Sequence, residues 1–353
     1  MSKVTRNRGQ SKREIVVKVG AAAYVGLDVH KKTVHAALVV NGVIVKTWSM
    51  PADKAAVAAS LAPYKAAIKG IVYEAGCTGF ALARYLIEQG YPVKVGAPSK
   101  MRRAAGPRAK SDRIDCCTLA VDLSKGEVPA VAIPTPIEEA DRQVMRLRSQ
   151  CVSKLKRAKQ QIKSFLLAHG IDEPEGLAHW SKASVEALQG LRLNGQLRFS
   201  LDCLLEELAY LKGELSRIEE HLRKLAGTRR LRKSVKALDA HTAVGPITAM
   251  AFALEIFNPR RFAEGGQVTN YVGLAPRVSQ SGSTRRDGPL MKTGRPELRA
   301  LLIEASWRWV AKDRHAAQVF ARLVRNTGSK QKAITGVARR LAIELWKIYR
   351  AAV

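Results

Sequence analysis

The sequence is short of cysteine and of long apolar runs, and each shortage excludes a class of protein. Its 353 residues include five cysteines, an odd number, with no pair at zinc-finger spacing. Cys116 and Cys117 are adjacent, which suits neither an ordinary disulfide nor a tetrahedral zinc site, so we expect reduced thiols. No apolar run reaches the roughly 18 residues of a membrane helix, and the basic N-terminus lacks a signal-peptide core. We therefore expect a cytoplasmic protein.

Acidic residues are also scarce. Lys and Arg total 60 against 30 Asp and Glu, a formal net charge of +30 at pH 7. A field of that sign concentrates polyanions, so a nucleic-acid backbone is the expected partner. A ribosomal-type or merely soluble basic protein is the alternative. The excess spreads along the whole chain rather than one tail, which favours nucleic acid.

Residues 21–135 alternate between strand and helix patterns, after a basic arm over 1–20 that we expect to be disordered. Two apolar runs, 24–28 and 71–74, each end in an acid, and Asn41-Gly42 is a strong hairpin signal. Further strands are expected at 35–40, 43–48 and 92–95, helices at 55–67, 80–89 and 114–123, and a basic loop at 99–113. This order predicts an α/β nuclease-like domain.

Residues 136–228 read as long helices. Leucine or isoleucine occupies successive a and d heptad positions from Leu201 to Leu225, which is typical of a coiled-coil seam. An earlier apolar series runs from Val144 to Phe165, and the segment between, 169–195, is irregular. The two helices either fold back as an antiparallel hairpin or zip to another subunit. The first helix also carries a basic row without acids, which we expect to meet phosphate: Arg146, Arg148, Lys154, Lys156, Arg157, Lys159 and Lys163.

Residues 229–353 form a third, mostly helical unit. Apolar patterns predict helices over 247–256, 296–309, 315–325 and 331–349. Residues 265–294 are rich in Gly, Ser, Thr and Arg, so we expect a loop region there. The predicted class is thus α/β plus α.

Four acids are candidates for one metal site. Asp28 and Glu74 end neighbouring strands, and the carboxyl ends of parallel strands meet at one sheet edge. Asp112 and Asp115 are three apart at a helix start and share one face. Such a cluster needs a cation, and hard oxygen ligands select Mg²⁺ or Mn²⁺, which support phosphodiester transfer. Alternatively each acid is a helix cap or salt-bridge partner, with Asp112 a good N-cap.

Three blocks in this part resemble a known family. They are Tyr24-Val-Gly-Leu-Asp28-Val-His, Tyr73-Glu74-Ala-Gly-Cys-Thr-Gly-Phe80 and Lys110-Ser-Asp112-Arg-Ile-Asp115. They resemble the DEDD transposases of insertion-sequence family 110, bacterial recombinases with an RNase H-like (RuvC-like) N-terminal domain. A later block, from Tyr271-Val-Gly-Leu-Ala-Pro276 through Ser281-Gly-Ser283 to Lys292-Thr-Gly-Arg295, resembles the family's C-terminal transposase domain. The second block is longer than in many members, and Cys116 replaces a common Ala.

The resemblance implies a role for Ser281. That residue matches the family serine thought to attack DNA and form a phosphoserine link, which conserves the phosphodiester energy for resealing. Without the resemblance, a serine in such a loop is usually a turn former, and Ser279 and Ser283 are rivals. Arg285, Arg286, Lys292 and Arg295 are candidates for offsetting phosphate charge, although a solvated basic loop is the alternative.

The resemblance also implies partners. Family members use a structured guide RNA that pairs with donor and target DNA, and they form dimers that assemble into tetramers, for which the heptad seam is the natural contact. The acids of one subunit then meet the serine of another subunit. We also expect the protein to be associated with the bacterial nucleoid. Candidate nucleic-acid contacts are Arg102, Arg103, Arg108, Lys110, Lys156, Arg157, Arg285, Arg286, Lys292 and Arg295.

Two other functions stay open. One is a metal nuclease of Holliday-junction-resolvase type, which hydrolyses DNA with water and forms no covalent link. The other is a basic RNA-binding scaffold without catalysis, whose acids are caps and salt-bridge partners.

Overall fold

A computed structural model describes residues 21–76, 78–98, 100–101, 112–281, 284–291 and 294–353, and it leaves out the side chains of 112–113, 278–281 and 284–287. Contacts divide the chain into two compact units, Met1–Pro134 and Thr135–Val353. Each unit is treated separately below. The predicted arm over 1–20 and most of the predicted basic loop lie outside the described residues.

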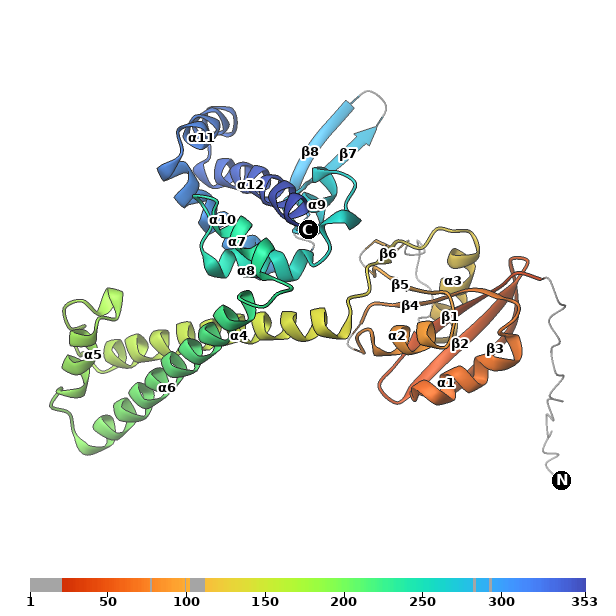
Figure 1. Cartoon of the computed structure of the whole chain (residues 1–353). Coiled ribbons are helices and arrows are strands. Elements are labelled where there is room, and N and C mark those ends of the chain that lie inside the picture. Colours follow the sequence, from red (N-terminus) through yellow and green to blue (C-terminus); the bar gives the residue numbers. More distant parts are fainter. Residues whose placement is uncertain (1–20, 77, 99, 102–111, 282–283, 292–293) are drawn as a thin grey trace, which may run out of the picture. The chain divides into compact units, whose positions relative to one another are not determined.

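The first unit is built on a mixed sheet with strand order β3-β2-β1-β4-β5-β6 (Figure 1). β1 pairs antiparallel with β2 and parallel with β4, and β4 pairs parallel with β5. The β2–β3 turn is Asn41-Gly42, where both residues have the positive φ that such a two-residue turn requires. The strands are β1 (Ala23–Val29), β2 (Thr33–Val40), β3 (Val43–Pro51), β4 (Ile68–Glu74), β5 (Val93–Gly96) and β6 (Ala130–Val131).

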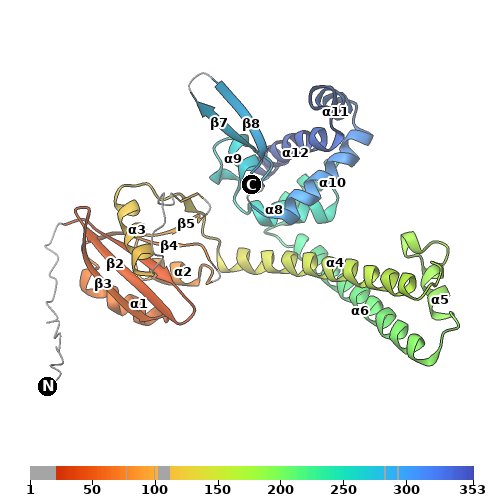
Figure 2. The ribbon, with the colours of Figure 1, turned by 180° about the vertical axis from the view of Figure 1, so that it is seen from behind.

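Helices cover both faces of this sheet. α1 (Lys54–Leu61), η1 (Ala62–Tyr64) and α2 (Ala81–Glu88) pack against the face that presents Val25 and Leu27. α3 (Asp112–Ser124) packs against the opposite face, where Cys116 and Ala120 meet β2 and Leu119 and Leu123 meet β4 (Figure 2). The helix predicted over 55–67 ends earlier than expected, because Pro63 closes it in a 3₁₀ turn.

The second unit begins with two long helices. α4 (Pro136–Ala168) starts with a capping box, in which Thr135 and Glu138 satisfy each other's backbone N–H groups. α6 (Gly195–Ala226) runs back beside α4, since Cys151 contacts Leu211 whereas Leu166 packs near Leu201 (Figure 1). The helices therefore form an antiparallel pair within one chain.

The segment between these helices is more ordered than expected. It contains η2 (Leu177–His179) and α5 (Lys182–Gln189), which begins at the N-cap Ser181. Our expectation of an irregular segment over 169–195 was wrong at α5. The helix is short, and its buried residues, Ser184 and Leu188, give too brief a pattern to stand out in the sequence.

The C-terminal part of this unit is mostly helical. Its core gathers around α8 and α12, whose inner faces are buried. The helices are α7 (Arg232–Asp239), α8 (Pro246–Ile256), η3 (Pro259–Arg261), α9 (Gly265–Tyr271), α10 (Pro296–Lys312), α11 (Arg314–Thr327) and α12 (Lys330–Ala352).

The expected loop over 265–294 was also wrong. The segment starts with α9 and continues as an antiparallel hairpin of β7 (Pro276–Ser281) and β8 (Thr284–Leu290). The composition does not predict these strands, because Pro, Gly, Ser and Arg have low strand propensity. Hydrogen bonding between the two strands outweighs that low propensity here.

The coarse class is confirmed: a mixed α/β sheet in the N-terminal region and a mostly helical remainder. Within the described part of the chain, no helix is both long and apolar enough to cross a membrane.

Candidate functional site

Asp28 and Glu74 lie at the carboxyl ends of adjacent parallel strands, β1 and β4. The register pairs Leu27 with Tyr73, and the next step places Asp28 beside Glu74. Strand side chains alternate between faces, and Tyr24 and Val72 contact α3 residues. Asp28 and Glu74 therefore belong to the α3 face, at the carboxyl end of the sheet.

α3 runs antiparallel to these strands. A Cβ at Gly26 of β1 would meet Cys116 and Ala120, whereas a Cβ at Gly70, near the start of β4, would meet Leu123. The helix therefore begins over the end of the sheet that carries Asp28 and Glu74. Its first turn contains Asp112 and Asp115, and Asp115 lies one turn before the buried Leu119.

The described acids lie at one end of the sheet without forming a closed site. Among the side chains that the structure describes, no three of His, Cys, Asp or Glu lie close enough to hold a metal ion. For Asp112, the structure describes only the backbone. Asp28 is mostly buried, Asp115 is partly exposed and Glu74 is exposed. The donors are carboxylate oxygens at one end of one sheet, and this donor chemistry fits a hard divalent cation.

His30 is a neighbour of the site that sequence reasoning missed. Its Nε2 lies 3.0 Å from Oδ2 of Asp28, and its ring meets that of His35 edge-on, with centroids 6.2 Å apart. His35 is the β2 residue directly opposite Asp28. The signal was present as the Asp28-Val-His30 spacing, because residues two apart along an extended segment lie on the same face.

The Asp28 charge also acts on α3. Burial, the neighbouring Cys117 and the Asp28 charge together raise the pKa of the Cys116 thiol to about 12. Cys116 is thus an uncharged, buried thiol that packs the helix onto the sheet. Among the other described cysteines, Cys151 is buried and Cys203 is exposed.

The segment after Glu74 is fixed by Tyr73. Its ring is fully buried, and its hydroxyl donates to the Gly79 carbonyl (3.0 Å) and accepts from the Ala83 N–H (3.3 Å). Gly79 has a φ of +66°, which favours glycine. One buried tyrosine thus joins the strand that ends in Glu74 to the start of α2.

Ser281 is the last residue of β7. It pairs with Thr284 across the hairpin, whereas Ser279 pairs with Arg286 and Gln280 with Arg285. Ser283 and Lys292 lie outside the described residues. No contact between the serine and the four acids follows from the structure, because they belong to separate units.

The base of this hairpin is held by Glu255 of α8. Its Oε1 accepts from the Tyr271 hydroxyl (3.3 Å) before the hairpin and lies 3.4 Å from the Arg295 Nε after it. A Cβ at Gly294 would lie 1.9 Å from the Tyr271 carbonyl oxygen, so only glycine allows this approach. Burial and the Glu255 charge raise the pKa of Tyr271. Sequence reasoning missed Glu255, which no local pattern marks.

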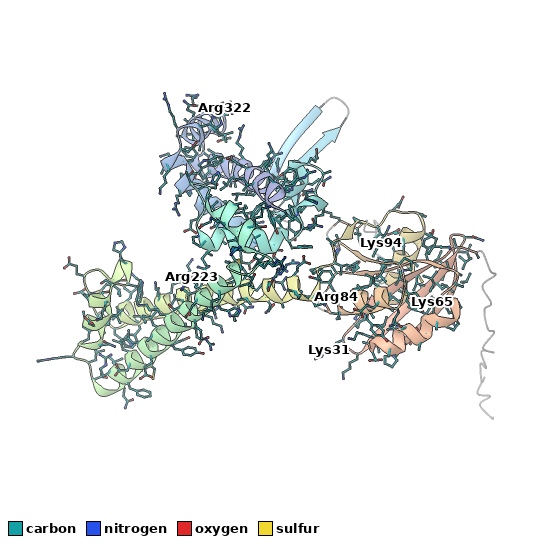
Figure 3. All side chains as sticks on the ribbon, in the orientation of Figure 1. Lys31, Lys65, Arg84, Lys94, Arg223 and Arg322 are labelled. Atoms are coloured by element: carbon teal, nitrogen blue, oxygen red, sulfur yellow. The ribbon has the colours of Figure 1, made fainter. Side chains whose placement is uncertain are left out.

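The predicted basic face of α4 is only partly free for a ligand. Lys154, Lys156 and Arg157 are exposed. Others in the row have partners within the chain: Arg148 pairs with Glu219 (2.7 Å), and Lys159 lies over the Trp180 ring. Basic side chains nevertheless lie on both units, including Lys31, Lys65 and Lys94 on the first and Arg223 and Arg322 on the second (Figure 3). Of the predicted nucleic-acid contacts, Arg102, Arg103, Arg108, Lys110 and Lys292 lie outside the described residues.

Comparisons with known proteins agree with this architecture. Residues 25–170 match a model of the DEDD transposases of IS110 type, and residues 235–321 match the transposase IS116/IS110/IS902 family. The chain is 30% identical to the putative transposase y4qE of Sinorhizobium fredii, over 94% of this chain and 89% of that protein. It is also 30% identical to the putative transposase y4rJ of S. fredii, over 80% and 77% of the two chains. The transposase for insertion sequence element IS1533 of Leptospira borgpetersenii is 25% identical, over 81% and 84%.

An α/β domain with a DEDD match, followed by a mostly helical C-terminal part, defines a transposase with an N-terminal DEDD domain. The chain belongs to the IS110 family of transposases.

Proposed function

We propose that this transposase cuts and rejoins the DNA of a bacterial insertion sequence by means of a carboxylate site and a serine nucleophile. The observation that carries the proposal is the shared end of the sheet, where β1, β4 and the first turn of α3 bring together the positions of four acids: Asp28, Glu74, Asp112 and Asp115. We also infer that this unit is RNase H-like (RuvC-like), that the paired long helices form a coiled coil, and that the domains divide at 20/21, 135/136 and 228/229.

The four acids would hold Mg²⁺ or Mn²⁺. Such an ion, when bound, lowers the pKa of a hydroxyl and offsets charge on a phosphate. His30 orients the Asp28 carboxylate through the 3.0 Å contact, and Tyr73 fixes the strand end that presents Glu74. These two residues restrict the motion of the acids before DNA arrives.

Ser281 is the proposed nucleophile. Its Oγ gives up its proton to solvent and attacks the phosphorus, and a P–Oγ bond forms. The bond from phosphorus to the leaving DNA oxygen breaks as that oxygen takes up a proton from solvent. A DNA hydroxyl later reverses the exchange and releases the serine, without ATP. Arg285, Arg286, Lys292 and Arg295 would offset the charge of the crowded phosphate. Ser279 and Ser283 are the residues to test as rivals.

A covalent adduct tests the mechanism. The protein is purified with its co-purifying nucleic acid, which is sequenced to supply the DNA substrates. Wild-type protein and Ser279→Ala should form a Mg²⁺-dependent protein–DNA adduct on denaturing gels, and Ser281→Ala should not. Asp28→Asn and Glu74→Gln should abolish strand cleavage while DNA binding and the circular dichroism spectrum persist.

Each rival function predicts a different result. A hydrolytic metal nuclease cleaves DNA with no adduct in any variant, and that outcome would overturn the serine mechanism. A non-catalytic scaffold has no Mg²⁺ requirement, and Asp28→Asn leaves its behaviour unchanged.

We further propose that a structured RNA guides the protein to donor and target DNA. The net charge of +30 and the exposed Lys154, Lys156 and Arg157 support an RNA backbone as a partner. Sequencing the co-purified RNA tests this: a defined RNA with segments complementary to two DNA sites is expected, and random RNA fragments would contradict it.

We propose association into dimers and tetramers through the helical pair. The predicted seam is not the free surface for this contact, because Leu201, Leu208, Leu211, Ile218 and Leu222 are buried within the chain. Large apolar side chains elsewhere on α4 and α6 are exposed and available: Leu147, Val152, Leu167, Phe199 and Tyr210. Light scattering on wild type and on Phe199→Ser, Tyr210→Ser should show loss of the larger species in the variant.

A further inference from the structure

The second unit contains a cavity lined with arginines, of which the functions above use only Arg295. It lies where α4 meets α8 and the start of α10, it opens to solvent, and its volume is about 30 Å³, measured as the space open to the centre of a water molecule. Arg142 and Arg146 of α4, Glu255 of α8, and Arg295 and Glu297 beside α10 contribute its charged lining.

One carboxylate serves several cations in this cavity. Glu255 lies 3.1 Å from Arg142 Nη2 and 3.4 Å from Arg295 Nε, and it also accepts from the Tyr271 hydroxyl. Glu297 is exposed at the rim. Three guanidinium groups, which stay charged in proteins, therefore face two carboxylates, of which Glu255 is mostly shielded from solvent. The cavity keeps a net positive charge.

Two buried donors of these arginines have no acceptor. The Nε atoms of Arg142 and Arg146 are shielded from solvent and make no hydrogen bond. Arg142 is 8% exposed, and the face of its guanidinium lies 5.3 Å from the Phe257 ring centroid. A buried N–H without an acceptor costs about 1–3 kcal/mol, more when the group is charged. The hydrogen-bonding capacity of Arg142 and Arg146 is therefore not fully satisfied within the chain.

The positive charges that line the cavity favour the binding of an anion there. Burial, together with the like charges of Arg295 and Arg142, lowers the pKa of Arg146. An anion in the cavity would reverse that repulsion. Phosphate suits the lining well, because guanidinium forks donate paired hydrogen bonds to its oxygens.

The cavity also adjoins the base of the serine hairpin. Arg295 lies five residues after the end of β8, and Glu255 contacts both Arg295 and Tyr271, which precedes β7. A phosphate held here would therefore be anchored to the same residues that hold the hairpin. A DNA strand engaged by the hairpin carries phosphates along its whole length, so DNA is favoured over free phosphate.

We propose that this cavity binds one backbone phosphate of the DNA substrate, with Arg146 and Arg142 as its principal donors. The inference rests on the proposed function, because it takes DNA as the substrate. It adds a contact to a backbone phosphate other than the one that Ser281 attacks. Arg146 is the residue to change, because Arg142 also neutralises Glu255.

Salt dependence of DNA binding tests the site. The affinity of the full-length protein for a fluorescein-labelled DNA duplex is measured by anisotropy over a series of NaCl concentrations. Each phosphate contact contributes about −0.9 to the slope of log K against log salt. Arg146→Gln should reduce the steepness by about that amount and weaken binding. Arg217→Gln, which removes an exposed arginine from α6, is the control with the same net charge and should keep the wild-type slope.

Further measurements separate the possible failures. Urea unfolding establishes that Arg146→Gln is folded, and inorganic phosphate should raise the melting temperature of wild type more than of this variant, at matched ionic strength. The site is overturned if folded Arg146→Gln binds DNA with the same salt slope as wild type. It is also overturned if the variant reduces the salt slope for single-stranded RNA but not for DNA. Wild type that binds DNA with the expected slope but forms no serine adduct overturns the proposed function and leaves the site intact.

Discussion

Gly26 of β1 lies directly against the backbone of Cys116 in α3. A Cβ at Gly26 would be 2.1 Å from the Cys116 carbonyl oxygen and 2.6 Å from the Ala120 nitrogen. Real Cβ atoms do not approach so closely, so the helix rests on the strand only because the residue is glycine. This contact sets the height of α3 above the sheet, and with it the position of Asp115 relative to Asp28.

Gly26→Ala should therefore lift α3 from the sheet. Overpacking of this kind costs about 1–3 kcal/mol of unfolding free energy. We expect a loss of that size in urea titrations, together with a larger loss of Mg²⁺-dependent DNA cleavage, because the acids separate.

Gly213→Ala is the matched control. A Cβ at Gly213 meets no heavy atom within 4 Å, and the residue lies within α6. Alanine favours the helix by up to about 1 kcal/mol, so this variant should be as stable as wild type or more so, and fully active. Equal behaviour of the two variants would show that the β1–α3 contact does not position the acids.

The sequence predicted the elements that carry the acids. Asn41-Gly42 marked the β2–β3 turn, and the apolar runs before Asp28 and Glu74 became β1 and β4. These signals are local, since a turn type and a strand period depend on neighbouring residues. The approach of α3 to Gly26 could not be predicted, because it joins segments about 90 residues apart by tertiary packing alone.

Tyr73→Phe should loosen the segment that follows Glu74. The change removes the hydroxyl that donates to Gly79 and accepts from the Ala83 N–H, and it leaves that carbonyl and N–H short of a partner. We expect a loss of about 1–3 kcal/mol in urea unfolding. Hydrogen exchange should quicken at Gly79 and Ala83. Tyr210→Phe, at an exposed position on α6, should change neither measurement.

Glu255→Gln should destabilise the second unit strongly. The substitution keeps the shape of the side chain and removes the charge opposite Arg142, which is buried. Removal of one partner of a buried ion pair costs roughly 3 kcal/mol or more, because the other charge stays buried without compensation. Urea unfolding measures this cost. Glu220→Gln, which removes the partner of Lys224 on the exposed face of α6, should unfold like wild type.

The same ion pair shows where sequence reasoning ends. Arg142 and Glu255 are 113 residues apart, and each belongs to a helix whose own pattern is complete without the other. The sequence marks Arg295 through a motif, yet nothing local connects it to Glu255. The strands of the hairpin that carries Ser281 were not predicted, for a related reason. They are stabilised by pairing with each other and not by a local sequence pattern.

Tyr349 should make the second unit sensitive to alkali. Burial raises the pKa of its phenol to about 12, from 10.0 for an ordinary tyrosine, and the hydroxyl donates to the Phe257 carbonyl at 3.1 Å. The folded state thus favours the protonated form. Its contribution to stability is complete below pH 10 and is lost as the pH rises from 10 toward 12, by at most roughly 1.4 kcal/mol per pH unit.

Urea midpoints measured across this interval should fall steeply for wild type. Tyr349→Phe should be about 1 kcal/mol less stable at neutral pH, because the hydrogen bond is gone, but its midpoint should fall less steeply. Tyr210→Phe, again the exposed control, should follow the wild-type curve. Parallel curves for wild type and Tyr349→Phe would mean that other groups, such as the buried Tyr271 with its own raised pKa, control the alkaline transition.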